Sequence, residues 1–158
     1  MKKIMIAMAA FCLMCACSGE REYLNFHGKS MGMSAKAMVD SLKAEGLAVD
    51  THATSETQIV LADTVKQNYM VTVYQHNDTI QDILEAFTAT YNDSTSALWQ
   101  TLHDQLQKEL DIWPGMTHRA DLHKEAVFDT DKGTIVLTLL NTYSPTLSVR
   151  YSTQLDHK

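Results

Sequence analysis

The chain has 158 residues, 45% of them hydrophobic, and its 13 basic and 19 acidic side chains give a formal net charge of −6 at pH 7. An acidic surface repels phosphate backbones and anionic headgroups, so the composition argues against a nucleic-acid-binding protein. The length fits one domain, or two small similar halves.

The N-terminus has the pattern of a secretion signal. Lys2 and Lys3 precede an uncharged apolar run of 14 residues, 4–17. A membrane-spanning helix needs roughly 20 such residues, so a cleaved signal peptide over residues 1–16 is the better interpretation. The run ends in Met-Cys-Ala-Cys, which resembles the bacterial lipobox except for its Met and its first Cys. We therefore predict cleavage before Cys17 and lipid on its thiol, with an ordinary signal peptide or a membrane-anchored N-terminus as the alternative.

The distribution of cysteine agrees with lipidation. All three cysteines lie within residues 12–17, and residues 18–158 contain none. A body of about 140 residues can bury a core without disulfides, so acylation explains why one thiol is retained. Several acyl chains anchor a protein firmly, which places the mature chain at a bacterial membrane. Ser18, rather than Asp, after the cysteine favours the outer membrane.

Residues 17–32 are predicted to form a lipidated tether, part of which can lie extended against the body. A helix is expected next, because Ser34 can cap its start and Gly46 suits its end. Met33 and Met38 have the spacing of a hydrophobic staple around the cap. Its apolar stripe consists of Met38, Val39 and Leu42.

Segments rich in β-branched and aromatic residues follow. Residues 57–62 and 69–74 are predicted strands, and Asn77-Asp78 is a predicted turn. Residues 80–88 are ambiguous, because their apolar side chains have helical spacing although the segment is short and follows a tight turn.

The second helix is the clearest element. Four leucines recur at every fourth position from Leu98 to Leu110, Asp93 or Ser94 can cap the start, and Pro114-Gly115 ends it. Strands are then expected at 125–128, 134–140 and 147–151, the first two joined by a turn over 129–133.

Each helix thus precedes strands. We expect an α+β fold of two αβββ-like halves, residues 33–91 and 93–158 of a single domain over 33–158. Each half would lay its helix on a short antiparallel sheet, or the two would share one sheet.

At several points the chain resembles small, largely uncharacterised lipoproteins of gut Gram-negative anaerobes. The likeness is carried by residues 26–30 (Phe-His-Gly-Lys-Ser), by residues 38–47 with their Leu-Lys-Ala-Glu-Gly-Leu ending, and by residues 131–137. It implies an α+β fold and a strand at 80–88, which we adopt. The order of elements is also similar to the small lipoprotein of the outer-membrane barrel-assembly machinery and to a tandem-repeat β-lactamase inhibitor. Architecture alone assigns no activity.

Metal sites are not favoured by the spacing of possible ligands. His118, Asp121, His123 and Glu125 lie close together, but they lack the H-x3-H or C-x2-C spacing of zinc sites. We interpret them as polar residues of a strand and its preceding loop. Residues 129–133 are similar to a calcium loop, yet its twelfth position would be Leu140, so a hairpin turn is preferred.

Catalytic patterns are also missing from the sequence. No serine has a G-x-S-x-G context, no glycine-rich phosphate loop occurs, and Glu109 and Asp111 are interpreted as solvated. Four aromatic residues, Tyr23, Phe26, Trp99 and Trp113, could line a ligand groove. Because the tryptophans flank the leucine stripe, we expect them to pack in the core instead.

The leading hypothesis is a non-enzymatic, lipid-anchored binding or accessory domain of the cell envelope, with no cofactor. Its expected partners are the membrane, through lipid on Cys17, and an envelope protein or a small ligand. The runner-up is a small hydrolase with a scattered active site. A third hypothesis, an inhibitor of a secreted enzyme, predicts a protruding loop with exposed aromatic residues.

Overall fold

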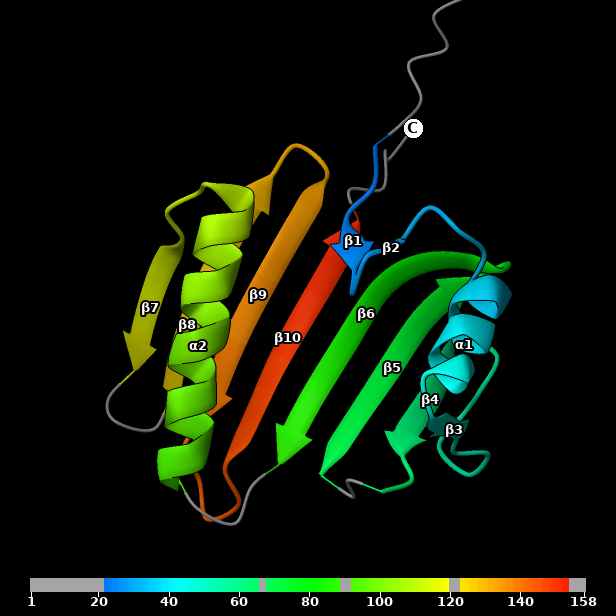
Figure 1. Ribbon diagram of the computed structural model, residues 1–158, viewed down its shortest axis with the longest axis horizontal. Coiled ribbons are helices and arrows are strands. Elements are labelled where there is room, and N and C mark those ends of the chain that lie inside the picture. Colours follow the sequence, from blue (N-terminus) through cyan, green and yellow to red (C-terminus); the bar gives the residue numbers. More distant parts are fainter. Residues whose placement is uncertain (1–21, 66–67, 89–91, 120–122, 154–158) are drawn as a thin grey trace, which may run out of the picture.

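The computed structural model describes residues 22–65, 68–88, 92–119 and 123–153. The predicted signal peptide, Cys17 and Asp121 lie outside these ranges. No helix within them is both long enough and apolar enough to cross a membrane. The elements, shown in Figure 1, are β1 (Asn25–Phe26), β2 (Lys29–Ser30), α1 (Ala35–Ala44), β3 (Leu47–Val49), β4 (Gln58–Asp63), β5 (Tyr69–His76), β6 (Thr79–Thr88), α2 (Asn92–Leu110), β7 (Gly115–Arg119), β8 (His123–Thr130), β9 (Gly133–Leu140) and β10 (Thr146–Thr153).

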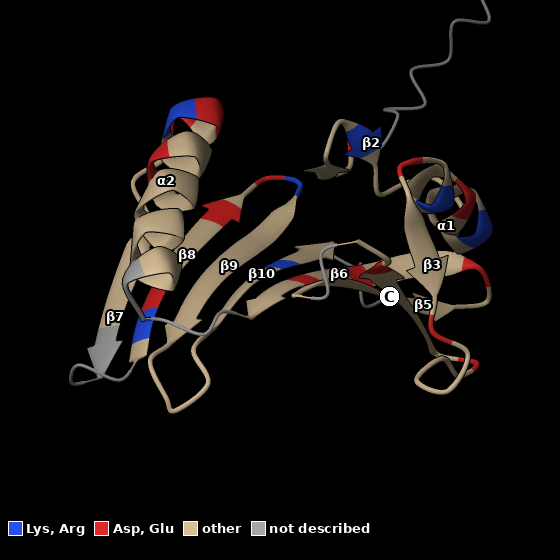
Figure 2. Cartoon of the chain, turned by 60° about the horizontal axis from the view of Figure 1, so that its bottom comes forward, with Lys and Arg blue, Asp and Glu red and all other residues tan. Residues whose placement is uncertain are grey.

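Eight of the strands form one antiparallel sheet in the order β3-β4-β5-β6-β10-β9-β8-β7. Its two sequence-distant parts join where β10 pairs with β6, from Thr146 opposite Thr88 to Ser152 opposite Asp82. The sheet is curved, and both helices lie on its concave face (Figure 2). β1 and β2 form a separate two-stranded hairpin over that face.

The predicted α+β fold of two αβββ-like halves is wrong. The described chain is mostly β, with two helices and one large antiparallel sheet rather than helix-then-strand repeats. Sequence patterns missed the edge strands β3 and β7, which are too short to show alternation of apolar and polar residues. They also could not show that β6 and β10 pair along their length and merge all the strands into a single sheet.

The first helix was predicted correctly, together with both of its ends. The Ser34 side chain accepts a hydrogen bond from the backbone N–H of Ala37 at 3.1 Å, and Gly46 has a φ of 102°. Met38, Val39 and Leu42 are buried, as the stripe indicated.

Residues 79–88 are a strand, which confirms the interpretation adopted for this segment. Asn77 and Asp78 have φ angles of 49° and 60°, so they form the tight hairpin turn that was expected before it. Pairing with β5 on one side and β10 on the other satisfies the backbone groups that a helix would have satisfied internally. Tertiary pairing therefore overrode the helical spacing.

The two tryptophans differ. Trp99 is only 1% exposed and packs in the core as predicted, whereas Trp113 is 85% exposed, so its predicted burial is wrong. The helix ends at Leu110, and Asp111 turns the chain with a φ of 54° before Trp113 can reach the sheet. The helix begins at Asn92, so Asp93 and Ser94 lie in its first turn.

The core lies between the helices, the β1–β2 hairpin and the concave face. From the start of the described chain, Leu24, Phe26 and Met31 are buried in it, which agrees with the extended N-terminal segment expected to lie against the body. The N-terminal segment therefore contributes side chains to the fold.

The sheet is wider than its two helices. Eight strands at a spacing of about 4.8 Å span about 34 Å, whereas two helices of about 10 Å diameter cover about 20 Å. Helix α1 packs on β3 and β5 near one edge, and α2 packs on β9 and β10 toward the other. Part of the concave face between the two helices is therefore left uncovered by them, and the β1–β2 hairpin covers only part of it.

Candidate functional site

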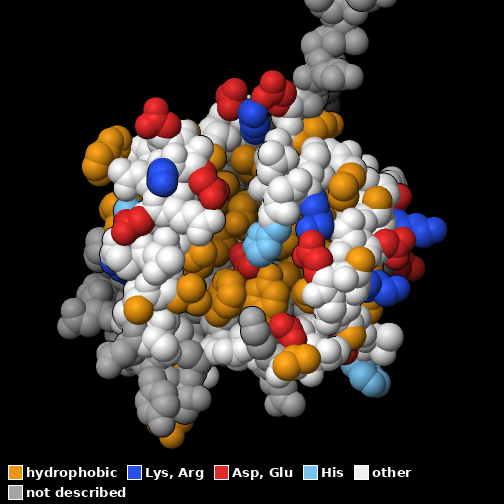
Figure 3. All heavy atoms as spheres, in the orientation of Figure 1, with side chains coloured by type: hydrophobic (Ala, Val, Ile, Leu, Met, Phe, Trp, Pro, Cys, Tyr) orange, Lys and Arg blue, Asp and Glu red, His pale blue; other side chains and the backbone are white. Residues whose placement is uncertain are grey.

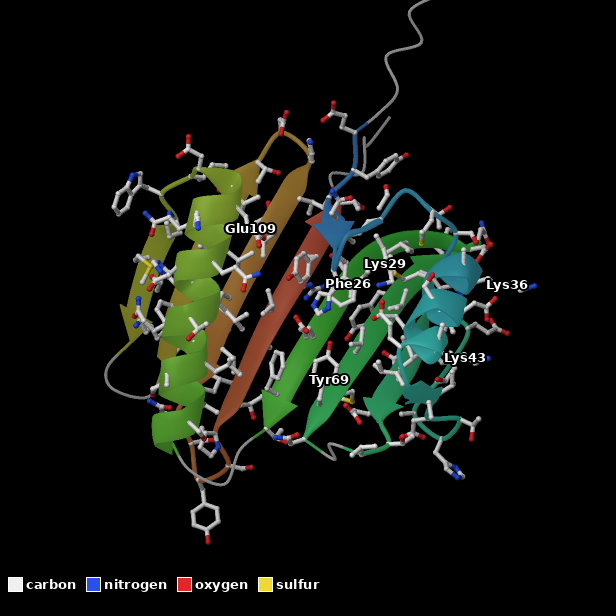
Figure 4. The ribbon with its side chains drawn as sticks, in the orientation of Figure 1. Phe26, Lys29, Lys36, Lys43, Tyr69 and Glu109 are labelled. Carbon is white, nitrogen blue, oxygen red and sulfur yellow. The ribbon has the colours of Figure 1, made fainter. Side chains whose placement is uncertain are left out.

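A groove runs along α2 on the concave face. Figure 3 shows a hollow with many hydrophobic side chains between α2 and the β1–β2 hairpin. Tyr69 and Phe87 from the sheet and Leu98 and Leu102 from α2 are partly buried apolar side chains that pack against the core. Figure 4 shows Phe26 and Tyr69 over the middle of the sheet, whereas Lys36 and Lys43 point outward from α1.

The tip of the β1–β2 hairpin places His27 over this region. His27 and Gly28 both have positive φ angles, 48° and 76°, which is the conformation of a two-residue type I′ hairpin turn. The His27 ring stacks on that of Phe26, with centroids 4.4 Å apart and an angle of 28° between the planes. Phe26 in turn packs edge-on against Tyr151 of β10, so the imidazole is held from behind by a buried aromatic pair.

Glu85 is the unusual residue of the sheet. It lies on β6 between Ile83 and Phe87 in the alternation that faces the helices, and it is 3% exposed. A carboxylate at such a position needs hydrogen-bond partners, because leaving it unpaired in an apolar setting is costly. Two are present, since its Oε1 lies 3.0 Å from His27 Nε2 and accepts a hydrogen bond of 2.7 Å from the Tyr69 hydroxyl.

These contacts change the acid–base properties of the cluster. The hydrogen bond to Glu85 raises the pKa of His27 above its ordinary value of 6.5, although partial burial of the ring opposes this. Burial, followed by the nearby Glu85 carboxylate, raises the pKa of Tyr69 strongly, so its hydroxyl stays protonated and donates. The site is therefore a buried carboxyl group contacted by two donors, one of which is a half-exposed imidazole.

The hairpin is fixed at a second point. Lys29, which follows the turn, pairs with Glu45 at the C-terminal end of α1. Together the two contacts hold the hairpin to both the sheet and the helix, so His27 is positioned by long-range contacts as well as by its turn.

The chemistry available to this cluster is limited. A carboxylate that orients an imidazole is part of the arrangement used in nucleophilic catalysis, but that arrangement also needs a serine or cysteine beside the imidazole. The hydrogen bonds just described join His27, Glu85 and Tyr69 to one another, and the cluster contains no such nucleophile.

The other residues singled out from the sequence do not join this site. His123 Nε2 lies 3.8 Å from Glu125 Oε2 on β8, and His118 lies on β7, where its backbone pairs with Lys124. Among the described residues no three His, Cys, Asp or Glu side chains group closely enough to hold a metal ion. Residues 129–133 form the predicted hairpin turn between β8 and β9. Glu109 and Asp111 are both exposed at the end of α2.

Sequence reasoning missed the central residues of the site. Residues 26–30 carry part of the resemblance to small lipoproteins, but no motif in the sequence assigned a role to His27 or to Glu85. One signal was present, because Glu85 interrupts an otherwise apolar alternation at Ile83, Glu85 and Phe87. Once residues 80–88 are assigned as a strand, that position requires a buried acid with partners.

Known proteins add no further information on this site. No protein-family model, curated protein or solved structure matches the chain.

Proposed function

We propose that this protein is a lipid-anchored binding protein of the bacterial cell envelope that holds an extended, mostly apolar ligand segment in the groove beside α2. The observation that carries the proposal is the half-exposed His27, fixed by buried Glu85 at the edge of a groove with apolar side chains. Pockets of this kind, with an apolar lining and a few convergent polar groups, are typical of binding sites.

The shape of the groove supports a long ligand. Helix α2, which borders the hollow, has 19 residues and is about 28 Å long, so a ligand lying beside it can be extended. Tyr69, Phe87, Leu98 and Leu102 would contact apolar side chains or an acyl chain. His27 would supply one hydrogen bond through the ring nitrogen that does not face Glu85.

Binding can be tested with 1-anilinonaphthalene-8-sulfonate, which combines an apolar ring system with one acceptor group. We expect saturable fluorescence enhancement with the acylated protein, and about fivefold weaker binding for His27→Asn, which can keep the left-handed turn. Lys43→Asn on the outer side of α1 is the matched control. Equal affinity in all three proteins would contradict a groove site.

The anchor is tested separately. Intact-mass analysis of the mature protein should show an acylated N-terminal Cys17, and Cys17→Ala should leave the membrane fraction. A mature N-terminus elsewhere, or an unmodified thiol, would overturn the envelope assignment.

An inhibitor of a secreted enzyme is a second candidate, favoured by one observation. Tyr143 lies in the connection between β9 and β10 and is fully exposed. The side chains of Thr142 and Thr146 both donate to the Ser144 carbonyl, which constrains the connection around it. A rigid loop with an exposed tyrosine is typical of surfaces that bind proteins. If the role is inhibition, Tyr143→Ala should abolish it and leave binding in the groove unchanged.

A further inference from the structure

A second surface lies at the end of α2. Trp113, in the connection from α2 to β7, is 85% exposed although it is the largest apolar side chain type. Met116, three positions further on, is also exposed. An indole left almost entirely in water is unusual for a solvated surface and is typical of a site that contacts another apolar phase.

A pocket lies directly beside this indole. Asp111, with its positive φ, turns the chain back so that the connection lies beside the last turns of the helix. The pocket is lined by Asp104, Gln107, Lys108, Asp111, Ile112 and Trp113. One ammonium and two carboxylates therefore surround an exposed aromatic ring. This charge pattern complements a zwitterionic headgroup, whose phosphate would face Lys108 and whose ammonium would face the carboxylates.

The pocket is at the end of the molecule where the chain enters the fold. Glu22 Oε2 lies 2.6 Å from Nζ of Lys132, in the turn between β8 and β9. Gly115 lies two residues after Trp113 and pairs with Val127 of β8. Val127 is only three positions before Thr130, the last residue of β8 before that turn. Figure 1 shows the end of α2, the β8–β9 turn and the start of β1 at the same end of the sheet.

The length of the tether restricts how this end can lie. Glu22 is five positions after Cys17, and five residue steps extend at most about 18 Å. If lipid holds Cys17 in the bilayer, Glu22 therefore lies within about 18 Å of the headgroups, and the end of the sheet that carries both Glu22 and Trp113 is the end nearer to the membrane. Tryptophan is the side chain that favours this interface most, because its ring is apolar and its N–H can donate.

We propose that Trp113 inserts into the headgroup layer of the same membrane that holds Cys17, with a zwitterionic phospholipid headgroup in the adjoining pocket. The inference rests on the lipid anchor of the proposed function. It adds an orientation, because Tyr143, in the β9–β10 connection at the opposite end of the sheet, then projects away from the point of attachment. The acidic formal charge of the chain disfavours anionic lipid, so the recognised surface is zwitterionic.

The single cysteine of the mature chain makes a direct test possible. Residues 17–158, with Cys17 coupled to a maleimide phospholipid, would be attached to phosphatidylethanolamine–phosphatidylcholine vesicles, with or without bromine on the acyl chains. Bromine quenches an indole that reaches the bilayer. We expect wild-type fluorescence to fall roughly twofold on brominated vesicles, and Trp113→Phe, which retains only the buried Trp99, to show no such loss.

Because coupling imposes the anchor chemically, this experiment tests the orientation alone. Flotation confirms that the protein is on the vesicles, so an unquenched wild type would overturn the insertion of Trp113 even if Cys17 is acylated in cells. Conversely, the coupled protein could be quenched on brominated vesicles while the protein from cells carries no acyl chain. That result would contradict the proposed lipid anchor but not the membrane contact of Trp113. Vesicles made of phosphatidylglycerol alone, brominated in the same way, should quench less, and equal quenching would overturn the zwitterionic headgroup assignment.

Discussion

The carboxylate of Asp78 accepts a hydrogen bond of 2.9 Å from the backbone N–H of Lys36, 42 positions earlier in the chain. The Asp78 carbonyl also accepts one of 2.9 Å from the N–H of Ala35. With Ser34 bonded to Ala37, three N–H groups that every helix start leaves unpaired are satisfied. The turn between β5 and β6 thus fixes the start of α1 to the sheet.

Removing this contact should destabilise the fold more than removing the local cap. We expect Asp78→Ala to lower the free energy of unfolding by about 2–3 kcal/mol, because the helix loses an acceptor and alanine is strained at a φ of 60°. Ser34→Ala should cost about 1 kcal/mol. Asp78→Asn keeps an acceptor and tolerates the turn, so it should recover most of the loss. Urea unfolding measures all three, and an Asn variant as unstable as the Ala variant would contradict capping by this side chain.

The contact between His27 and Glu85 should make stability depend on pH. Its hydrogen bond to Glu85 raises the pKa of His27 in the folded protein, with Glu45 acting in the same direction and Lys29 opposing it. A raised folded-state pKa stabilises the fold fully below the unfolded pKa of about 6.5, and this contribution is lost as pH rises through the folded-state value.

We therefore expect the stability advantage of wild type over His27→Asn to be largest below the unfolded pKa of about 6.5 and to decrease as the pH rises through the folded-state pKa. Urea unfolding across this range measures it, and Lys43→Asn is a control that should keep the wild-type slope. A gap between wild type and His27→Asn that widens with rising pH would contradict the charged pair.

The buried Glu85 should stabilise the fold through the two donors that contact its carboxyl group. Glu85→Leu alone leaves the Tyr69 hydroxyl and the imidazole without their acceptor, which should cost about 1–3 kcal/mol. Adding Tyr69→Phe removes one of the stranded donors, so the double variant should be more stable than Glu85→Leu. Thermal unfolding gives the two values. If the loss of unfolding free energy in the double variant equalled the sum of the losses in Glu85→Leu and Tyr69→Phe, the two side chains would not be coupled.

Two glycines with positive φ offer a matched comparison. A Cβ at Gly133 would meet the Ser152 carbonyl oxygen and lie 2.9 Å from the Leu24 side chain, whereas a Cβ at Gly28 has nothing within 4 Å. Gly28→Ala should cost about 1–2 kcal/mol through its backbone conformation alone. Gly133→Ala should cost more than 3 kcal/mol, because the turn must also separate from β10. Equal losses in chemical denaturation would show that the close approach is relieved without cost.

The sequence determined the elements whose physics is local. The cap at Ser34, the left-handed Gly46, the tight turn at Asn77-Asp78 and the leucine spacing of α2 involve residues within a few positions of one another. Such patterns are set by backbone geometry and side-chain periodicity, so they appear in a single sequence.

Tertiary structure decided the rest, because those outcomes depend on residues far apart in the chain. Strand β6 exists through its neighbours β5 and β10, and Glu85 is tolerable only because His27, 58 positions earlier, and Tyr69 reach its carboxylate. The exposure of Trp113 follows from where α2 ends relative to the sheet. Burial and strand pairing depend on the whole assembled sheet. The side chains of Glu85, His27 and Tyr69 are therefore brought together only when the eight strands form one sheet.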